Sequence, residues 1–332
     1  MKAIKVNKRK AHEILKRLKK ENLLDDRYNV KKTKPFLYFP VKSNVKGYKI
    51  LNVKFERKVR QRLSLVEALQ RKLPKSKLEL VPRSYDIIGD IAVIEIKPGL
   101  TKYEKLIANT LLDLNKNVKV VAKKVGIHKG LFRTQDLKVL AGEKRKTTLH
   151  KENNVKIFLN VETCYFSPRL STERKRVMEQ VKKNETVLIM FSGVAPYPLV
   201  IAKNTGVKEV IGIEINSEAH KFAEQNLVLN KIKNIKLYCG NVKKIVPKLK
   251  KKFDRIAMPL PKDAEHFLGS AKLVSKKGTI IHFYDFLDEK EFPEKSISKI
   301  RKVFKNFKVL KAVKCGQYSP GRYRVCIDFK VL

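Results

Sequence analysis

The chain has 332 residues, of which 43% are hydrophobic, so it can build about two domains with packed cores and is not a disordered polymer. Its 76 lysine and arginine residues outnumber 32 acidic residues and give a formal net charge of +44, which predicts a polyanionic partner. Nucleic acid is favoured over a membrane surface, because the basic residues are spread along the chain and no run of about 20 apolar residues is present.

The first 62 residues predict a small α+β domain. Residues 1–20 read as a basic amphipathic helix without the apolar stretch of a secretory signal, so we expect a cytoplasmic protein. Apolar runs predict strands over residues 36–41 and 48–55. The chain therefore opens with a compact basic unit.

A linker and a second domain follow. Residues 63–82 contain the helix breaker Pro74 and predict a linker. Residues 83–158 predict a middle RNA-binding domain, with a hairpin that turns at Gly89 and Asp90 and a helix over residues 101–115. Further strands are expected over residues 118–126 and 155–160.

Residues 159–332 have a different pattern, in which apolar strand runs alternate with helical stretches. This alternation predicts βαβ units, a largely parallel sheet and a wound α/β domain of the Rossmann-like class. The expected strands cover residues 187–191, 209–215, 235–240, 255–260 and 278–286, and the expected helices 199–204, 217–230 and 263–276.

The loops after these strands carry the signature of a nucleoside site. Gly193 follows the first strand, and Glu214 ends the second strand, 21 positions later, where a carboxylate can bind ribose hydroxyls. Asn241 follows the third strand, where its amide could pair with an adenine edge. The loop is no full dinucleotide motif, since Ala195 stands where a second glycine is usual. Two plainer interpretations remain: Glu214 as the acid at a helix start and Asn241 as part of an ordinary turn.

Two other chemistries have little support in the sequence. The cysteines are too far apart for a zinc knuckle, and the nearest pair, Cys315 and Cys326, has no histidine close by. We therefore expect neither a metal site nor disulfides, and buried thiols instead. No Walker lysine motif is present, so phosphoryl transfer is not expected.

Six segments together resemble the archaeal and eukaryotic type of tRNA (guanine-37 N1) methyltransferase. They are HKEN (150–153), YFSPRLSTER (165–174), MFSGVAPYPLVIA (190–202), IGIEIN (211–216), RIAMPLP (255–261) and GTIIHFYDF (278–286). The resemblance covers essentially the whole chain. It implies a class I methyltransferase domain that binds S-adenosylmethionine, a middle domain that holds the anticodon stem-loop, and an N-terminal domain that checks the outer corner of the tRNA.

The resemblance also implies catalytic roles. Glu173 matches the general base that removes the proton from guanine N1, and Arg133 matches an arginine that contacts the target base and offsets charge on O6. Pro259 matches a position beside the reacting base. Arg145, Arg169 and Arg133 are the expected RNA contacts.

The same resemblance implies a cofactor set. We expect contacts with S-adenosylmethionine from Tyr165, Phe166, Arg174, Phe191, Gly193, Glu214, Ile215, Asn241, Val242 and Pro259. Tyr165 and Phe166 could instead stack on a flipped base. A plainer interpretation of this segment is a helix start at Ser167 and Pro168, followed by a solvated charged face that includes Glu173 and Arg176.

The chain departs from the family pattern at three places. Ile189 and Asn241 replace acidic residues, and Pro259, Leu260 and Pro261 stand where the enzymes that methylate only guanine N1 carry Asn-Leu-Pro. The last feature is similar to the archaeal branch of wyosine biosynthesis, some members of which also methylate C7 of 4-demethylwyosine. A second activity of this kind stays open.

Two alternatives compete with methyl transfer. One is the related transferase that moves an aminocarboxypropyl group onto 4-demethylwyosine, whose relatives lack the N-terminal domain. The other is a non-catalytic RNA-binding protein, which the departures at Ile189 and Ala195 favour. In each case tRNA is the expected partner, and the large charge together with the resemblance predicts a monomer.

Overall fold

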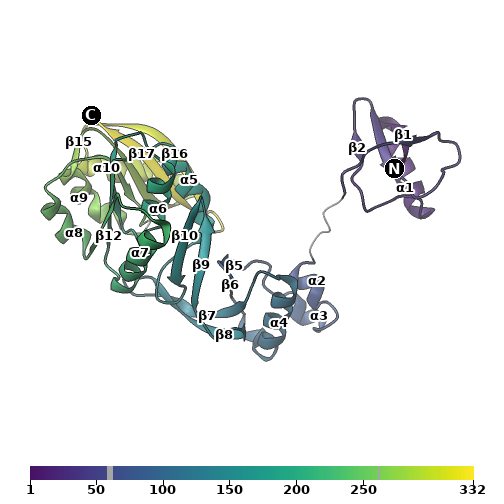
Figure 1. The fold of residues 1–332 in the computed structure, drawn as a ribbon, viewed down its shortest axis with the longest axis horizontal. Helices are drawn as coiled ribbons and strands as arrows, with labels where there is room; N and C mark the ends of the chain where they lie inside the picture. Colours follow the sequence, from purple (N-terminus) through teal and green to yellow (C-terminus); the bar gives the residue numbers. More distant parts are fainter. Residues whose placement is uncertain (58–62, 261) are drawn as a thin grey trace. The chain divides into compact units, whose positions relative to one another are not determined.

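The computed structural model describes residues 1–57, 63–260 and 262–332 (Figure 1). The chain forms two compact units, Met1–Leu63 and Ser64–Leu332. Among the described helices, none has the length and apolar character needed to cross a bilayer.

The first unit is a four-stranded sheet with one α-helix. Its elements are β1 (Lys2–Asn7), a 3₁₀ turn (Lys8–Lys10), α1 (Ala11–Lys20), β2 (Lys31–Lys32), β3 (Phe36–Pro40) and β4 (Ile50–Asn52), in the sheet order β2-β3-β1-β4. The helix predicted over residues 1–20 is wrong for its first half. Ile4 and Val6 are buried in a strand that pairs with β3, because a distant partner strand completes the backbone hydrogen bonds.

The next part of the chain is a second sheet covered by helices. It contains α2 (Leu65–Leu69), α3 (Lys75–Leu78), β5 (Asp86–Ile88), β6 (Ile91–Ile94), a 3₁₀ helix (Pro98–Tyr103), α4 (Glu104–Leu114), β7 (Val120–Lys129) and β8 (Thr134–Gly142). The sheet order is β5-β6-β7-β8. The predicted hairpin at Gly89, which has a φ of +58°, and the predicted helix at 101–115 are confirmed.

The linker predicted over residues 63–82 is instead part of this second sheet's core. Ser64 caps α2 through a capping box with Glu67. Leu65 and Leu69 are buried with Ile107 of α4. Pro74 therefore separates two short helices and does not mark a hinge.

A two-stranded ribbon joins this sheet to the C-terminal domain. It consists of β9 (Thr147–Glu152) and β10 (Val155–Asn160). The side chains of Asn226 and Asn230 hydrogen-bond the backbone of Phe158 and Lys156, which fixes β10 against the C-terminal domain. The boundary predicted between residues 158 and 159 therefore falls too late, since β10 already packs into the C-terminal core.

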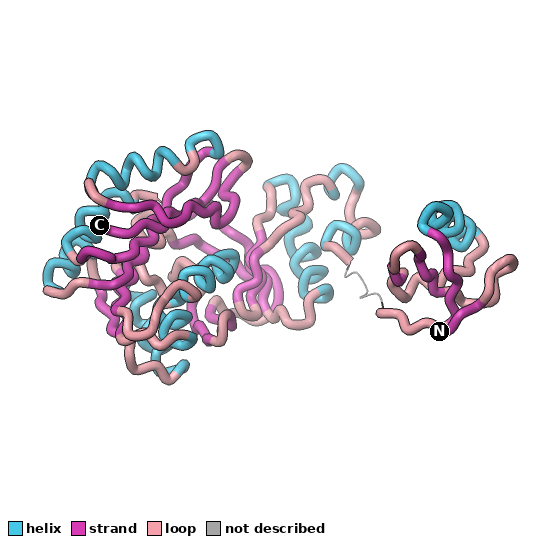
Figure 2. The backbone as a smooth tube through the Cα atoms, turned by 90° about the horizontal axis from the view of Figure 1, so that it is seen from above, coloured by secondary structure: helices cyan, strands magenta, loops and turns pink. Residues whose placement is uncertain are grey.

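The C-terminal domain has a seven-stranded sheet in the order β13-β12-β11-β14-β15-β17-β16. Figure 2 shows its strands in magenta, with helices in cyan on both sides. Its strands are β11 (Thr186–Met190), β12 (Glu209–Glu214), β13 (Ile235–Cys239), β14 (Phe253–Met258), β15 (Ser275–Asp288), β16 (Phe307–Ser319) and β17 (Arg322–Val331). The first five are parallel, as predicted, and β16 and β17 add an antiparallel hairpin that the pattern did not predict.

Helices cover both faces of this sheet, so its central strand is apolar on both sides. Val187 and Ile189 of β11 face α5 (Ser171–Met178), α6 (Pro196–Asn204) and α7 (Ser217–Asn230). Leu188 and Met190 face α8 (Val242–Ile245), α9 (Leu268–Leu273) and α10 (Glu294–Val303). Short 3₁₀ turns cover Pro168–Leu170, Val246–Leu249, Ala264–Phe267 and Glu289–Glu291. The predicted Rossmann-like class is confirmed.

Candidate functional site

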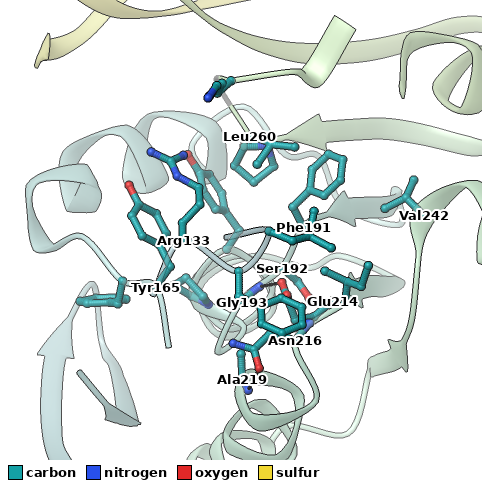
Figure 3. Close-up of a pocket in the computed structure, with 18 of the residues that line it drawn as sticks. Arg133, Tyr165, Phe191, Ser192, Gly193, Glu214, Asn216, Ala219, Val242 and Leu260 are labelled. Carbon is teal, nitrogen blue, oxygen red and sulfur yellow. Dashed lines mark hydrogen bonds between the residues drawn. The ribbon is translucent and has the colours of Figure 1, made fainter. Parts of the chain in front are cut away.

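A cavity of about 390 Å³ lies at the carboxyl ends of the parallel strands. In Figure 3, Arg133 and Tyr165 lie on one side of it, and Phe191, Glu214 and Val242 on the other. The predicted residues that line it are Arg133, Tyr165, Phe166, Arg174, Phe191, Gly193, Glu214, Ile215, Asn241, Val242 and Pro259. This volume is within the range of small-molecule sites.

The turn after β11 holds the carboxylate of Glu214. Gly193 has a φ of +56°, a conformation that suits glycine, and its N–H donates to Glu214 Oε2 at 2.7 Å (Figure 3). The N–H of Asn216 donates to Oε1 at 2.8 Å, and burial raises the pKa of Glu214. Asn216 caps α7, so Glu214 is not the capping residue. The carboxylate is therefore fixed at the wall of the cavity by two backbone donors.

This turn is also strained at two residues that are not glycine. Phe191 and Ala195 have φ values of +61° and +64°. Backbone of this kind is costly for residues with a Cβ and concentrates at ligand sites. The ring of Phe191 packs edge-on against Phe267, with centroids 4.8 Å apart. Asn241 uses its Oδ1 to accept the N–H of Lys243 at 2.8 Å, so it caps α8 while lining the cavity.

Ser192 is a cavity residue that no sequence motif indicated. Its side chain is buried, and its Oγ has no hydrogen-bond partner among the described residues. A buried hydroxyl without a partner is unfavourable, so its place in the wall suits a polar ligand. Its position between Phe191 and Gly193 was the available signal.

Arg133 and Tyr165 form the opposite wall. Arg133 belongs to the loop between β7 and β8, has a φ of +54°, and places its guanidinium carbon 4.7 Å from the Tyr165 ring centroid. Arg324 of β17, which no sequence motif indicated, donates from Nη2 to the Tyr165 hydroxyl at 3.2 Å. This wall therefore brings together segments far apart in sequence.

Glu173 lies behind the wall and does not line the cavity. The residue is 5% exposed, and its carboxylate accepts two hydrogen bonds from Arg176, at 2.7 and 2.8 Å. The Tyr284 hydroxyl donates to Oε1 at 2.6 Å, and the hydroxyls of Tyr284 and Tyr197 lie 2.9 Å apart. Tyr197 does line the cavity. In this structure Glu173 is thus connected to the cavity wall by two hydroxyl groups.

The other predicted arginines are paired with carboxylates. Arg174 lines the cavity, but its side chain is 2% exposed and its guanidinium binds Glu152 at 2.5 and 2.6 Å. Burial alone would raise the pKa of Glu152, but hydrogen bonds from His150 and Arg174 lower it. Glu152 therefore occupies the guanidinium of Arg174 in this structure, and the contact of Arg174 with S-adenosylmethionine stays a prediction. Outside the cavity, Arg169 binds Asp86 at 2.6 Å and Arg145 binds Asp90 at 2.6 and 2.9 Å.

The buried group His282, Cys326 and Asp328 has ligand types suited to a metal ion. His282 Nδ1 lies 2.6 Å from Asp328 Oδ1, while the guanidinium groups of Arg255 and Arg176 contact His282 and Asp328. Two arginines would repel a further cation there, so this cluster is an ionic network. All four cysteines are free thiols. Cys164 and Cys326 are buried as expected, but the expectation is wrong for Cys239, which is exposed, and for Cys315, which is half-buried.

Three families match the chain in order. They are the tRNA methyltransferase 5 N-terminal domain over residues 3–49, the TYW2 N-terminal domain over residues 65–145, and the TRM5/TYW2 methyltransferase domain over residues 148–311. The last two matches meet between residues 145 and 148, in agreement with the position of the β9–β10 ribbon.

The chain is similar to proteins named as tRNA methyltransferases. It is 36% identical to the tRNA (guanine(37)-N(1))-methyltransferase Trm5b of Pyrococcus abyssi, over 99% of this chain and 98% of that protein. The crystal structure of P. abyssi Trm5b covers 99% of both chains with a TM-score of 0.78. The tRNA (guanine(37)-N(1))/4-demethylwyosine(37)-methyltransferase Taw22 of Nanoarchaeum equitans is 34% identical, over 75% of this chain and 100% of that protein. The structure of aTrm5 in complex with tRNALeu covers 100% of both chains, with 29% identity and a TM-score of 0.74.

Proposed function

Because the chain belongs to the TRM5/TYW2 methyltransferase family, we propose that it transfers a methyl group from S-adenosylmethionine to N1 of guanosine 37 in tRNA. One observation carries the proposal beyond family membership. A single cavity joins the Gly193 turn and Glu214, which suit a nucleoside, to Arg133 and Tyr165, which suit a nucleic-acid base. Donor and acceptor of the methyl group can therefore meet in one cavity.

The residues at the strand ends fit S-adenosylmethionine. Glu214 offers a fixed carboxylate to ribose hydroxyls, and the unpartnered Oγ of Ser192 offers a further polar contact. The rings of Phe191 and Phe267 give an apolar surface beside them. The bound cofactor supplies an electrophilic methyl group on a sulfonium centre.

On the acceptor side, Arg133 is placed to offset negative charge on O6 as N1 loses its proton. We assign Glu173 as the base that accepts the N1 proton. The proton reaches its carboxylate through the hydrogen-bonded hydroxyls of Tyr197 and Tyr284. Arg174 acts indirectly, since its pair with Glu152 holds the segment that carries Tyr165 and Phe166.

A second substrate, C7 of 4-demethylwyosine, is favoured by one feature of the cavity. Pro259 and Leu260 line it, and neither side chain forms hydrogen bonds. A polar side chain there would require a matching hydrogen-bonding group on the base, whereas this apolar wall accepts a modified ring. Pro261, the last residue of the predicted motif, lies outside the described residues. Aminocarboxypropyl transfer is less well supported, because the chain carries the tRNA methyltransferase 5 N-terminal domain.

The test is transfer of labelled methyl to tRNA transcripts with guanosine or adenosine at position 37, followed by nucleoside mass spectrometry. Label as 1-methylguanosine only in the guanosine transcript supports the proposal. Label on tRNA that carries 4-demethylwyosine supports the second substrate. No label on any of these RNAs, from protein that still binds tRNA, would indicate a non-catalytic RNA-binding protein instead.

We also propose that the protein acts as a monomer in the cytoplasm. A formal net charge of +44 opposes the approach of a second copy unless an anion lies between them. Light scattering after gel filtration, with and without tRNA, measures the number of copies directly.

A further inference from the structure

The hairpin of β16 and β17 supplies an exposed aromatic ring to the rim of the cavity. Tyr318, near the end of β16, lines the cavity and is 62% exposed. Its ring packs against Phe286 of β15, with centroids 4.5 Å apart and an interplanar angle of 45°. A large ring is thus supported on one side and open to solvent on the other.

Arg324 ties this ring pair to the wall that holds Arg133. Arg324 is opposite Phe286 in the β15–β17 ladder, and its guanidinium carbon lies 5.5 Å from the Phe286 ring centroid. The same guanidinium donates to the Tyr165 hydroxyl, and Arg133 lies over the Tyr165 ring. Tyr318 therefore stands at the outer end of a continuous row of rings and guanidinium groups.

The row ends in solvent, and a second exposed segment lines the same cavity. Leu131 and Phe132, beside Arg133 in the β7–β8 loop, are 73% and 46% exposed. Exposed apolar and aromatic side chains beside a cavity are typical of surfaces on which unpaired bases stack. The basic character of the chain makes an RNA strand the fitting occupant.

We propose that Tyr318 stacks on the base of a nucleotide directly next to the methylated one; this inference rests on the proposed function. A base that enters the cavity leaves its stack, so its neighbours lose a stacking partner at the rim. Tyr318 lies at the rim with most of its surface open, which suits a neighbour better than the reacting base. Tyr318 is thus a positioning residue that holds the strand while guanosine 37 occupies the cavity.

The first test compares Tyr318→Ala with Tyr318→Phe, which keeps the ring. We expect Tyr318→Ala to raise the KM and the Kd for tRNA by roughly 5- to 150-fold with little change in kcat, and Tyr318→Phe to restore wild-type values. Tyr238→Ala is the matched control, because Tyr238 is a partly exposed tyrosine of β13 that does not line the cavity. An unchanged KM and Kd in Tyr318→Ala, or equal losses in Tyr318→Ala and Tyr238→Ala, would overturn the proposal.

The second test asks which base Tyr318 contacts. Transcripts lacking the base on one or the other side of guanosine 37 are assayed with wild-type protein and Tyr318→Ala. For one of the two sides, loss of the base should weaken the binding of tRNA to the wild type but should lower the tRNA affinity of Tyr318→Ala little further. If removal of the base on either side lowered the tRNA affinity of Tyr318→Ala as much as that of the wild type, the contact would be refuted. Because tRNA affinity is measured alongside methylation, failure of methyl transfer to intact tRNA would count against the proposed function, and this cycle would still decide the contact.

Discussion

Replacing Glu173 with glutamine separates a chemical role from a structural one. The carboxylate binds Arg176 twice and accepts the Tyr284 hydroxyl, so a neutral amide loses the charge and turns an N–H toward one of these donors. Arg176 keeps its two hydrogen bonds to Asp328, at 2.5 and 3.1 Å, so no buried charge is left without a partner. We expect a loss of roughly 1.5–3 kcal/mol in the free energy of unfolding, less than for an orphaned buried charge.

The kinetic effect should be larger than the structural one. If Glu173 accepts the N1 proton, Glu173→Gln should lower the single-turnover rate roughly 10²- to 10⁴-fold at saturating tRNA and cofactor. The Kd values for both ligands should stay near wild type, because the side chain lies outside the cavity. Urea unfolding, filter binding of tRNA and rapid quench of labelled methyl transfer give the three quantities.

Tyr284→Phe is the companion variant, because it removes one hydroxyl and leaves the charges of Glu173 and Arg176 in place. If the proton moves through the hydroxyls of Tyr197 and Tyr284, the rate of methyl transfer should fall in this variant as well. If Glu173→Gln were less stable yet transferred methyl at the wild-type rate, Glu173 would be only an ion-pair partner of Arg176. Normal transfer by Tyr284→Phe beside a slow Glu173→Gln would reject the hydroxyl route and retain the base.

Three further outcomes follow from the site and its charges. Glu214→Gln should weaken S-adenosylmethionine binding roughly 10- to 100-fold in equilibrium dialysis, because a charged acceptor for ribose hydroxyls is lost. Burial lowers the pKa of His282, so the unfolded chain binds a proton first as the pH falls below about 6.5. Below that pH, the free energy of unfolding of the wild type, measured with urea, should therefore fall by up to about 1.4 kcal/mol per pH unit. The same measurement on His282→Gln should show a weaker dependence on pH. Affinity for tRNA should fall steeply and linearly on a log–log plot against salt concentration, and a shallow slope would contradict binding through phosphates.

The sequence predicts well the features set by neighbouring residues. Gly193 lies in the turn after β11, and Glu214 ends the adjacent parallel strand β12. Strand order alone therefore brings them to one edge of the sheet, where they hydrogen-bond. The helix over residues 101–115 and the hairpin at Gly89 are likewise local patterns.

Features set by distant partners could not be predicted. Arg174 pairs with Glu152, and Arg145 pairs with Asp90, which is 55 positions away. A sequence motif identifies the arginine but does not identify the carboxylate with which it pairs in the folded protein. The β16–β17 hairpin is similar, since Arg324 reaches Tyr165 only because β17 pairs with β15.

Ile189 stands where the family pattern has an acidic residue, and its surroundings show how the chain can bind the cofactor without that acid. It is fully buried in β11 between Gly212 and Ala257 on the neighbouring strands, where a carboxylate would be desolvated. The polar contact available at this end of the strand is Ser192 Oγ, which is buried without a partner among the described residues. A buried hydroxyl without a partner disfavours folding until a ligand binds to it.

Ser192→Ala tests this directly, with Ser275→Ala as the contrast. Ser275 is also buried, but its hydroxyl donates to the carbonyl of Ala271 at 2.6 Å. Ser275→Ala should lower the free energy of unfolding by about 1 kcal/mol and leave cofactor affinity unchanged. Ser192→Ala should leave stability unchanged or higher and weaken S-adenosylmethionine binding roughly 2- to 12-fold by calorimetry. If Ser192→Ala lost stability and bound the cofactor as tightly as wild type, the hydroxyl would have a structural partner and no role in the site.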